Sequence, residues 1–359
     1  MKTLGEIFEI GSGGTPSKTH PEYYDGNIPW VKTGDLKDEY LYSVEDCISE
    51  EGLNNSSAKM YPSGTVLIAM YGVTIGATSI LKFDACTNQA CAAFKPCEEV
   101  LPEYLYFFLR SKKQKFISDG VGGAQPNISA GYLKKVSIDV RNIKEQEKIV
   151  TVLDKLNGII QKRQKEIDEL DELIKARFVE MFGDPISNDK GWTTDTLTAV
   201  CSRIYGGGTP SKSHPEYYEG SIPWVSPKDM KSDVITDSID HITKEAIENS
   251  TTNLVPEGSV LMVIRSGILK HDLPVSINAV PVTINQDMKA FVPGENITAS
   301  FLRNYFKAIE LDVLAGVRGV TADNIDFKAF QQRKIIVPPI HLQEEFEDFC
   351  RQVDKSKVA

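Results

Sequence analysis

The sequence predicts an α+β fold in which two homologous domains of mixed helices and strands are separated by long coiled-coil helices. Two observations predict this fold class. A stretch at residues 13–31 returns almost unchanged at residues 207–225, and forty residues between the two copies have the composition of one long helix. The chain has 359 residues, more than twice the common domain size of about 150 residues. More than one domain is therefore expected.

The repeat is the clearest feature of the sequence. Gly13 to Val31 reads GGTPSKTHPEYYDGNIPWV, and Gly207 to Val225 reads GGTPSKSHPEYYEGSIPWV, with 16 of 19 positions identical. The correspondence continues at an offset of 194 residues and then at 197, where Asn88-Gln89 falls opposite Asn285-Gln286. Solenoid repeats are only about 20 to 50 residues long, so this period indicates the duplication of a whole domain.

Each copy combines short strands with a helix. Runs of β-favouring residues lie between turn residues, and a helical pattern follows them in each copy. The expected strands are Ile28 to Val31, Thr65 to Met70, Val260 to Ile264 and Lys334 to Val337, and the expected helices are Pro102 to Lys115 and Ala299 to Leu311.

The segment between the copies predicts a helix over Ile143 to Phe182. It has no proline and one glycine, and Gly183-Asp184-Pro185 then ends it. Alternate steps of four and three residues from Ile149 to Met181 meet apolar side chains at eight of ten positions, which is typical of a coiled coil. We expect these side chains to form the coiled-coil interface: Ile149, Leu153, Leu156, Ile160, Ile167, Leu170, Ile174 and Met181.

A shorter helical pattern follows the second copy. The expected domains are thus residues 1–142, the central helix 143–182, residues 183–340, and the start of a second helix at 341–359. About nineteen residues follow Ile340, against forty in the central helix.

Composition excludes several classes of protein. No run approaches the roughly 18 apolar residues that a membrane span needs, and Glu6 and Glu9 interrupt the beginning of the chain where a signal peptide would be apolar. A cytoplasmic protein without a membrane partner is expected. The formal charge of −10 disfavours nucleic-acid binding by charge alone. The six cysteines contain no Cys-x-x-Cys pair and predict no metal site.

No catalytic set is present in the sequence. Gly13 to Lys18 lacks the Gly-Lys dipeptide of a phosphate-binding loop, and Pro16 removes an amide donor. An enzyme acting alone is therefore not expected. The loop is interpreted either as a tight turn that opens a sheet or as an exposed loop whose Thr, Ser and Lys contact DNA.

The two copies differ between their shared motifs. Tyr71 to Gly76 falls opposite a segment around Arg265, and Gly122 to Asn127 falls opposite Arg318 to Asp323. A shared scaffold with different loops is typical of two units that read different short sequences, since Arg contacts guanine and Asn or Gln contacts adenine.

These motifs together resemble the specificity subunit of type I restriction-modification systems. The resemblance rests on the two Gly-Gly-Thr-Pro-Ser motifs, the two Ile-Pro-Trp-Val stretches, Asn88-Gln89, the helix from Ile143, and Met181 to Pro185 leading to Gly191-Trp192. It covers nearly the whole chain.

The resemblance implies two target recognition domains, each reading half of a bipartite site in double-stranded DNA, and an antiparallel helix pair that sets the spacer. It implies modification subunits that methylate adenine N6 with S-adenosylmethionine, and restriction subunits that use ATP with Mg²⁺. No cofactor is expected in this chain itself. A full second helix is also implied, so the short second helix predicts partial pairing, and a homodimer formed head to tail is an alternative assembly.

The residues expected to contact DNA share polar side chains in the repeated and variable loops. They are Thr15, Ser17, Lys18, Tyr71, Thr74, Asn88 and Gln125 in the first domain, and Thr209, Ser211, Lys212, Arg265, Gln286, Arg318 and Thr321 in the second. The competing hypothesis is a duplicated coiled-coil scaffold that binds protein or glycan and has no DNA specificity.

Overall fold

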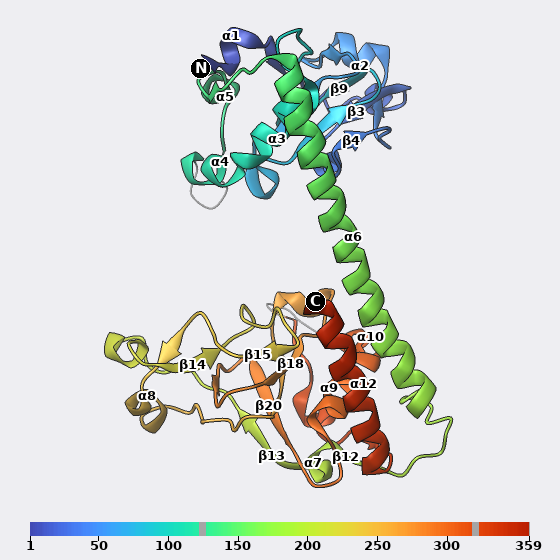
Figure 1. Ribbon diagram of the computed structural model, residues 1–359, viewed down its shortest axis with the longest axis vertical. Helices are drawn as coiled ribbons and strands as arrows, with labels where there is room; N and C mark the ends of the chain where they lie inside the picture. The colour runs from blue at the N-terminus through green and yellow to red at the C-terminus, as the bar shows by residue number, and fades with distance from the viewer. Residues whose placement is uncertain (122–126, 318–322, 359) are drawn as a thin grey trace. The chain divides into compact units, whose positions relative to one another are not determined.

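The computed structural model describes residues 1–121, 127–317 and 323–358 (Figure 1). The chain divides into two compact units, Met1–Lys162 and Arg163–Ala359. Each unit combines helices with β-sheets, and the sheets of the two units share one plan except for one edge strand. The expected α+β class with a duplicated mixed domain is confirmed.

The first unit holds a five-stranded sheet of order β2-β10-β7-β8-β4 and a four-stranded sheet of order β5-β3-β9-β6. Neighbours are antiparallel except for the parallel pairs β4/β8 and β3/β9, and β1 pairs with β11. The strands are β1 (Lys2–Thr3), β2 (Ile10–Ser12), β3 (Ile28–Val31), β4 (Tyr40–Leu41), β5 (Cys47–Ile48), β6 (Met60–Tyr61), β7 (Val66–Ala69), β8 (Thr78–Leu81), β9 (Ala85–Thr87), β10 (Cys91–Phe94) and β11 (Ser137–Ile138).

The second unit repeats the five-stranded sheet as β13-β20-β17-β18-β15 and pairs β12 with β21. Its smaller sheet has three strands, of order β16-β14-β19, and an isolated bridge between Val255 and Val282 stands where the first unit has the β6/β9 pair. The parallel pairs β15/β18 and β14/β19 recur at the same places. The strands are β12 (Thr194–Thr196), β13 (Cys201–Gly206), β14 (Ile222–Val225), β15 (Val234–Ile235), β16 (His241–Ile242), β17 (Val260–Val263), β18 (Val275–Asn278), β19 (Thr283–Ile284), β20 (Met288–Pro293) and β21 (Lys334–Ile336).

Short helices surround the sheets of each unit. They are α1 (Leu4–Ile7), α2 (Glu50–Asn54), α3 (Pro102–Ser111), α4 (Lys113–Asp119) and α5 (Ala130–Lys134) in the first unit, and α7 (Leu197–Val200), α8 (Lys244–Glu248), α9 (Ala299–Ala308), α10 (Glu310–Ala315) and α11 (Phe327–Phe330) in the second. In the sequence the strands β7 and β17 are uninterrupted apolar runs, and every residue in them is buried. Both faces of these central strands are covered, which explains the absence of polar alternation.

Two helices predicted as single elements are each broken by one residue. The helix expected over Pro102 to Lys115 ends at Ser111 and restarts after Lys112, whose ψ is 0°. The helix expected over Ala299 to Leu311 breaks at Ile309, whose ψ is 9°. Both residues leave the α-helical region for the bridge region, and neither is a glycine or proline that would announce the break.

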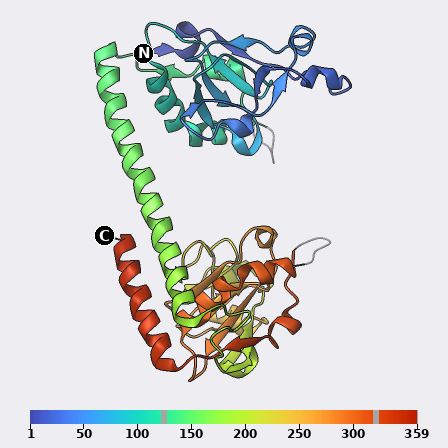
Figure 2. The same cartoon turned by 90° about the vertical axis from the view of Figure 1, so that its right-hand side faces the viewer.

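The long helix α6 spans Ile143–Phe182, as the sequence predicts. A second helix, α12, spans Ile340–Val358, and in the second unit it lies antiparallel beside the end of α6 (Figure 2). The pairing is fixed by contacts between Arg163 and Ser356, and between Arg177 and Glu345.

The end of α6 is also packed into the core of its unit. Phe178 and Phe182 are buried and pack against Phe301 of α9 and Phe346 of α12, with ring centroids 4.9 to 5.5 Å apart and mostly edge-to-face geometry. Such aromatic pairs add stability beyond the burial of their surface. Across the described residues, no helix combines the length and the apolar composition that a membrane crossing requires.

Candidate nucleic-acid interface

The repeated glycine loop is shaped by a close approach to the strand beside it. Gly14 N donates to Thr87 O at 2.9 Å, and Gly208 N donates to Ile284 O at 3.0 Å. A Cβ atom on Gly13 would lie 1.7 Å from Thr87 O, and one on Gly207 would lie 1.7 Å from Asn285 O. Only glycine can occupy these positions, which explains the Gly-Gly pair in both copies.

Two aromatic side chains of each domain hold this loop by hydrogen bonds to its backbone oxygens. Trp30 Nε1 donates to Gly14 O at 3.0 Å, and Tyr24 donates its hydroxyl to Pro16 O at 2.6 Å. Trp224 and Tyr218 make the same bonds in the second copy, at 3.0 and 2.6 Å. Burial raises the pKa of both tyrosines, so both remain hydroxyl donors at neutral pH. The loop is thus a preorganised element in each domain.

The pinned loop presents polar groups to solvent at its tip. Ser17 and Lys18 are exposed in the first copy, and Ser211 and Lys212 are exposed in the second. The serine hydroxyls lie 2.7 Å from Thr19 Oγ1 and Ser213 Oγ, respectively. Hydroxyl and ammonium groups of this kind commonly contact DNA phosphates.

The threonine of each loop has a glutamine partner. Thr15 donates its hydroxyl to Gln89 Oε1, and Thr209 donates to Gln286 Oε1. Sequence reasoning selected Gln286 but not Gln89. The signal for Gln89 was present, since Asn88-Gln89 aligns with Asn285-Gln286.

Asn88 has a clear local task. Its Oδ1 accepts from Ala90 N at 3.1 Å, and its own backbone N–H donates to Val31 O at 2.9 Å. These bonds close the turn between β9 and β10. Asn88 lies next to the residue that matches Gln286, rather than at the matching position.

A second pair of equivalent positions lies at the ends of β7 and β17. Tyr71 forms a bridge with Asn127, and Arg265 forms the equivalent bridge with Asn324. Tyr71 is 41% exposed, and its backbone oxygen accepts from the hydroxyl of Thr74 at 3.1 Å. The structure therefore places the predicted residues Tyr71 and Arg265 at one shared point of the two folds.

Arg265 carries an ion pair that the first domain lacks. Its Nε and one terminal nitrogen both lie 2.6 Å from Asp287 Oδ1. Asp287 also accepts from Asn285 Nδ2 at 3.2 Å, whereas the position equivalent to Asp287 is Ala90 in the first domain. Asp287 was not selected from the sequence, because its role depends on the register of β17 and β20.

Three predicted contact residues, Gln125, Arg318 and Thr321, lie outside the described residues. The other DNA-contact candidates of each domain come from three short stretches, which are the glycine loop, the turn that holds Asn88 or Gln286, and the segment after β7 or β17. The candidates of the two domains therefore lie on equivalent stretches of the shared fold.

The predicted coiled-coil side chains have different surroundings along α6. Leu170, Ile174 and Met181 pack on the core of the second unit, to which Leu342 and Phe346 of α12 also belong. In the first unit the helix carries exposed aliphatic side chains, at Val152, Leu156, Ile159 and Ile160, that are 50 to 66% exposed. Ile149, Leu153 and Ile167 are partly buried.

Comparisons with known proteins agree with this arrangement. The family described as type I restriction modification DNA specificity domain matches twice, over residues 1–171 and 189–359. The chain is 30% identical over 338 residues to the specificity subunit of a type I restriction enzyme of Escherichia coli, covering 90% of this chain and 82% of that protein. It is 27% identical over 379 residues to the specificity subunit of the type I restriction enzyme MjaIX of Methanocaldococcus jannaschii, covering 98% and 85% of the two chains.

Solved structures show the same fold at low sequence identity. The S subunit of a type I restriction-modification system from M. genitalium superposes with a TM-score of 0.52 at 14% identity, over 99% of this chain and 89% of that one. A chain from a structure describing complex assembly and conformational transition of the type I system gives 0.54 at 17% identity, over 99% and 90%. Because the family matches both halves of the sequence and the relatives align along most of its length, this protein belongs to the type I restriction-modification DNA specificity family.

Proposed function

We propose that this chain is the non-catalytic DNA-recognition subunit of a type I restriction-modification complex. It binds a bipartite target in double-stranded DNA and directs adenine-N6 methylation and restriction by partner subunits. One observation carries the proposal: both copies hold the same pinned glycine loop, whereas the side chains beside it differ. A constant frame with different reading groups suits the recognition of two different half-sites.

The side chains of the glycine loop and those at the strand-end bridge offer different kinds of contact to DNA. Ser17, Lys18 and their counterparts supply groups that bind phosphates in any sequence. Arg265 and Tyr71 occupy the same point of the fold but offer different contacts to a base. An arginine can donate two hydrogen bonds to guanine, whereas a tyrosine offers one hydroxyl and an aromatic ring.

The two domains and the two long helices have different tasks in this complex. Residues 1–142 and 183–340 read the two half-sites, while residues 143–182 and 341–359 set their spacing and contact the modification subunits. The exposed aliphatic side chains of α6 support a protein contact on this helix, since a partner can bury them. A second copy paired head to tail along α6 is the other proposed occupant, and the mass of the isolated chain in solution distinguishes the two.

The cofactors belong to the partners in this proposal. Two modification subunits would bind S-adenosylmethionine, and the restriction subunits would use ATP and Mg²⁺, in the cytoplasm where the DNA lies. The formal charge of −10 supports the need for partners, because the neutralisation of DNA phosphates must come largely from other chains.

A methylation map tests the proposal. The chain is co-expressed with its cognate modification subunit in a host without adenine methylation, and the DNA is sequenced for N6-methyladenine. We expect a split, asymmetric motif. A palindromic motif would favour the homodimer with one type of half-site. If the purified complex forms but leaves no methylation above the modification subunit alone, the proposal is wrong.

A further inference from the structure

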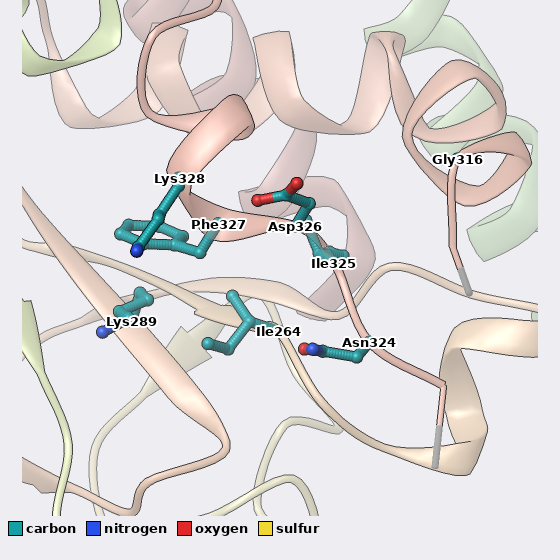
Figure 3. Close-up of a pocket in the computed structure, with 8 residues that line it drawn as sticks. All are labelled: Ile264, Lys289, Gly316, Asn324, Ile325, Asp326, Phe327 and Lys328. Atoms are coloured by element: carbon teal, nitrogen blue, oxygen red, sulfur yellow. The ribbon is translucent and has the colours of Figure 1, made fainter. Parts of the chain in front are cut away.

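A cleft of about 720 Å³ opens beside the Arg265 position of the second domain (Figure 3). Its walls come from the end of β17, from β20, from Gly316 after α10, and from the start of α11 with the segment before it. The polar side chains in it are Lys289, Asn324, Asp326 and Lys328, and Phe327 forms an apolar wall. The candidate contact residues selected from the sequence include none of these.

Among the described residues, Lys289 is a cation without a matching anion. It lies on β20 and is partly buried, and its Nζ lies 4.7 Å from the centroid of the Phe327 ring. In the part of the chain that the structure describes, no carboxylate oxygen lies within 4.0 Å of this ammonium group. Burial lowers the pKa of Lys289, which is the direction expected when a cation loses water without gaining a partner.

The cleft holds a second lysine and one carboxylate besides Lys289. Lys328 is exposed, and it lines the same cleft as Lys289 and Phe327 (Figure 3). Asp326 keeps its negative charge, and its Oδ1 accepts from Ala329 N at 3.2 Å as the cap of α11. Among the described residues, it forms no ion pair within 4.0 Å with Lys289 or Lys328. Two ammonium groups beside one apolar wall are therefore available to an anion.

The first domain lacks this site. Lys289 pairs with Met262 across the sheet, and the equivalent pair in the first domain is Ala92 with Ile68. The strands share one register, so the alanine occupies the lysine's position and removes the cation. The site thus belongs to one domain of a duplicated pair rather than to their common frame.

We propose that this cleft binds a backbone phosphate of the DNA beside the half-site read by the second domain. Lys289 and Lys328 provide the charge, the Asn324 amide donates a hydrogen bond, and Phe327 contacts the adjoining sugar. A DNA phosphodiester fits these groups because they combine positive charge and an amide donor with an apolar wall. The inference rests on the proposed function, since it assumes that the second domain faces DNA.

Salt-dependent DNA binding tests the site. The full chain is assembled with its modification subunit and titrated with two duplexes over a range of salt concentrations. One duplex carries the target sequence that the methylation map identifies, and the other carries a scrambled sequence. We expect Lys289→Met to reduce the slope of log affinity against log salt by about 0.9, the value for one lost phosphate contact. The affinities for both duplexes should fall by the same factor, because a phosphate contact carries no sequence information.

Three variants make the result specific. Lys289→Met keeps an unbranched apolar chain against Phe327, and Lys289→Arg restores the charge and should restore the slope. Lys334→Ala removes an exposed lysine of β21, outside the cleft, the glycine loop and the two long helices, and should leave the slope unchanged.

The outcomes separate this site from the proposed function. If the wild-type complex prefers its target but Lys289→Met and Lys328→Met together keep its slope and affinity, the phosphate site is wrong. Loss of preference for the target at an unchanged slope would overturn it in favour of base reading, and loss of assembly would overturn it in favour of a contact with an acidic protein segment. If the wild-type complex shows no sequence preference, the proposed function itself fails.

Discussion

The two domains share the same backbone contacts at the glycine loop and at the strand-end bridge, but they carry different side chains around that bridge. In both, an aromatic pair pins the glycine loop and a bridge joins the end of β7 or β17 to an asparagine. Around that bridge the first domain has Tyr71, Ala90 and Ala92, and the second has Arg265, Asp287 and Lys289. Duplication has therefore kept the backbone contacts and changed the charge of the surface that they support.

The largest expected effect tests the shared frame. Gly13→Ala and Gly207→Ala should each lower the free energy of unfolding of their domain by about 3 kcal/mol or more, because the new methyl group would lie 1.7 Å from a backbone oxygen. Thermal unfolding of the chain measures this, and the two losses should be similar. Dissimilar losses would contradict a common loop geometry.

Matched controls are available for both substitutions. No heavy atom lies within 4 Å of a Cβ built on Gly34 or on Gly267. Gly34→Ala and Gly267→Ala should therefore change the unfolding temperature little. A large loss in these controls would show that glycine is needed for a reason other than space.

The next effect concerns how each helix is fixed to its domain. Gln146 is fully buried; its Oε1 accepts from Leu101 N at 2.9 Å, and its Nε2 donates to the oxygens of Glu99 and Arg141 at 2.8 and 2.7 Å. Gln146→Leu leaves three backbone groups without partners and should lower the free energy of unfolding by about 2 to 3 kcal/mol. Chemical denaturation measures the loss.

Gln343 makes the equivalent contacts in the second domain. Its Oε1 accepts from Thr298 N at 2.9 Å, and its Nε2 donates to the oxygens of Asn296 and Pro338 at 3.0 and 2.8 Å. Gln343→Leu should therefore cost as much as Gln146→Leu, whereas Gln161→Leu, at an exposed position of α6, should cost little. Unequal losses for the two buried glutamines would show that the helix attachments have diverged.

A smaller effect should separate the two reading surfaces. Arg265→Ala should relax one half of the methylated motif, by roughly 1 to 3 kcal/mol at one base pair if the arginine contacts guanine. Tyr71→Ala should alter the other half only. Methylation maps of the two variants measure both effects, and changes in the same half-site would contradict the assignment of one half-site to each domain.

Much of this comparison could be predicted from the sequence. The repeat predicted two equivalent domains, and the apolar spacing predicted α6 from Ile143 to Phe182. Local patterns were sufficient there because identity and periodicity are both properties of contiguous residues. The breaks at Lys112 and Ile309 were not predicted, since neither residue is a glycine or proline that a local pattern would mark.

The details of the candidate site required the three-dimensional register. Lys289 lies in a β-strand and resembles an ordinary surface lysine in the sequence. Its position beside Phe327, without an ion-pair partner among the described residues, follows only from the pairing of β20 with β17 and from the place of α11. The Arg265–Asp287 pair joins residues 22 positions apart for the same reason.

The smallest expected effect tests whether that ion pair matters for reading rather than for stability. The Arg265 side chain is 48% exposed and that of Asp287 is 22% exposed, so Asp287→Ala should lower the free energy of unfolding by at most about 1 kcal/mol. The same change frees Arg265 from its only acidic contact within 4.0 Å among the described residues. We therefore expect weaker discrimination in the second half-site, because the guanidinium loses the group that orients it. Asp287→Asn keeps an acceptor oxygen at this position and should retain more of the discrimination than Asp287→Ala. If both variants methylate the wild-type motif with unchanged preference, Asp287 has only a structural role, and the charge difference between the two domains at this point does not affect recognition.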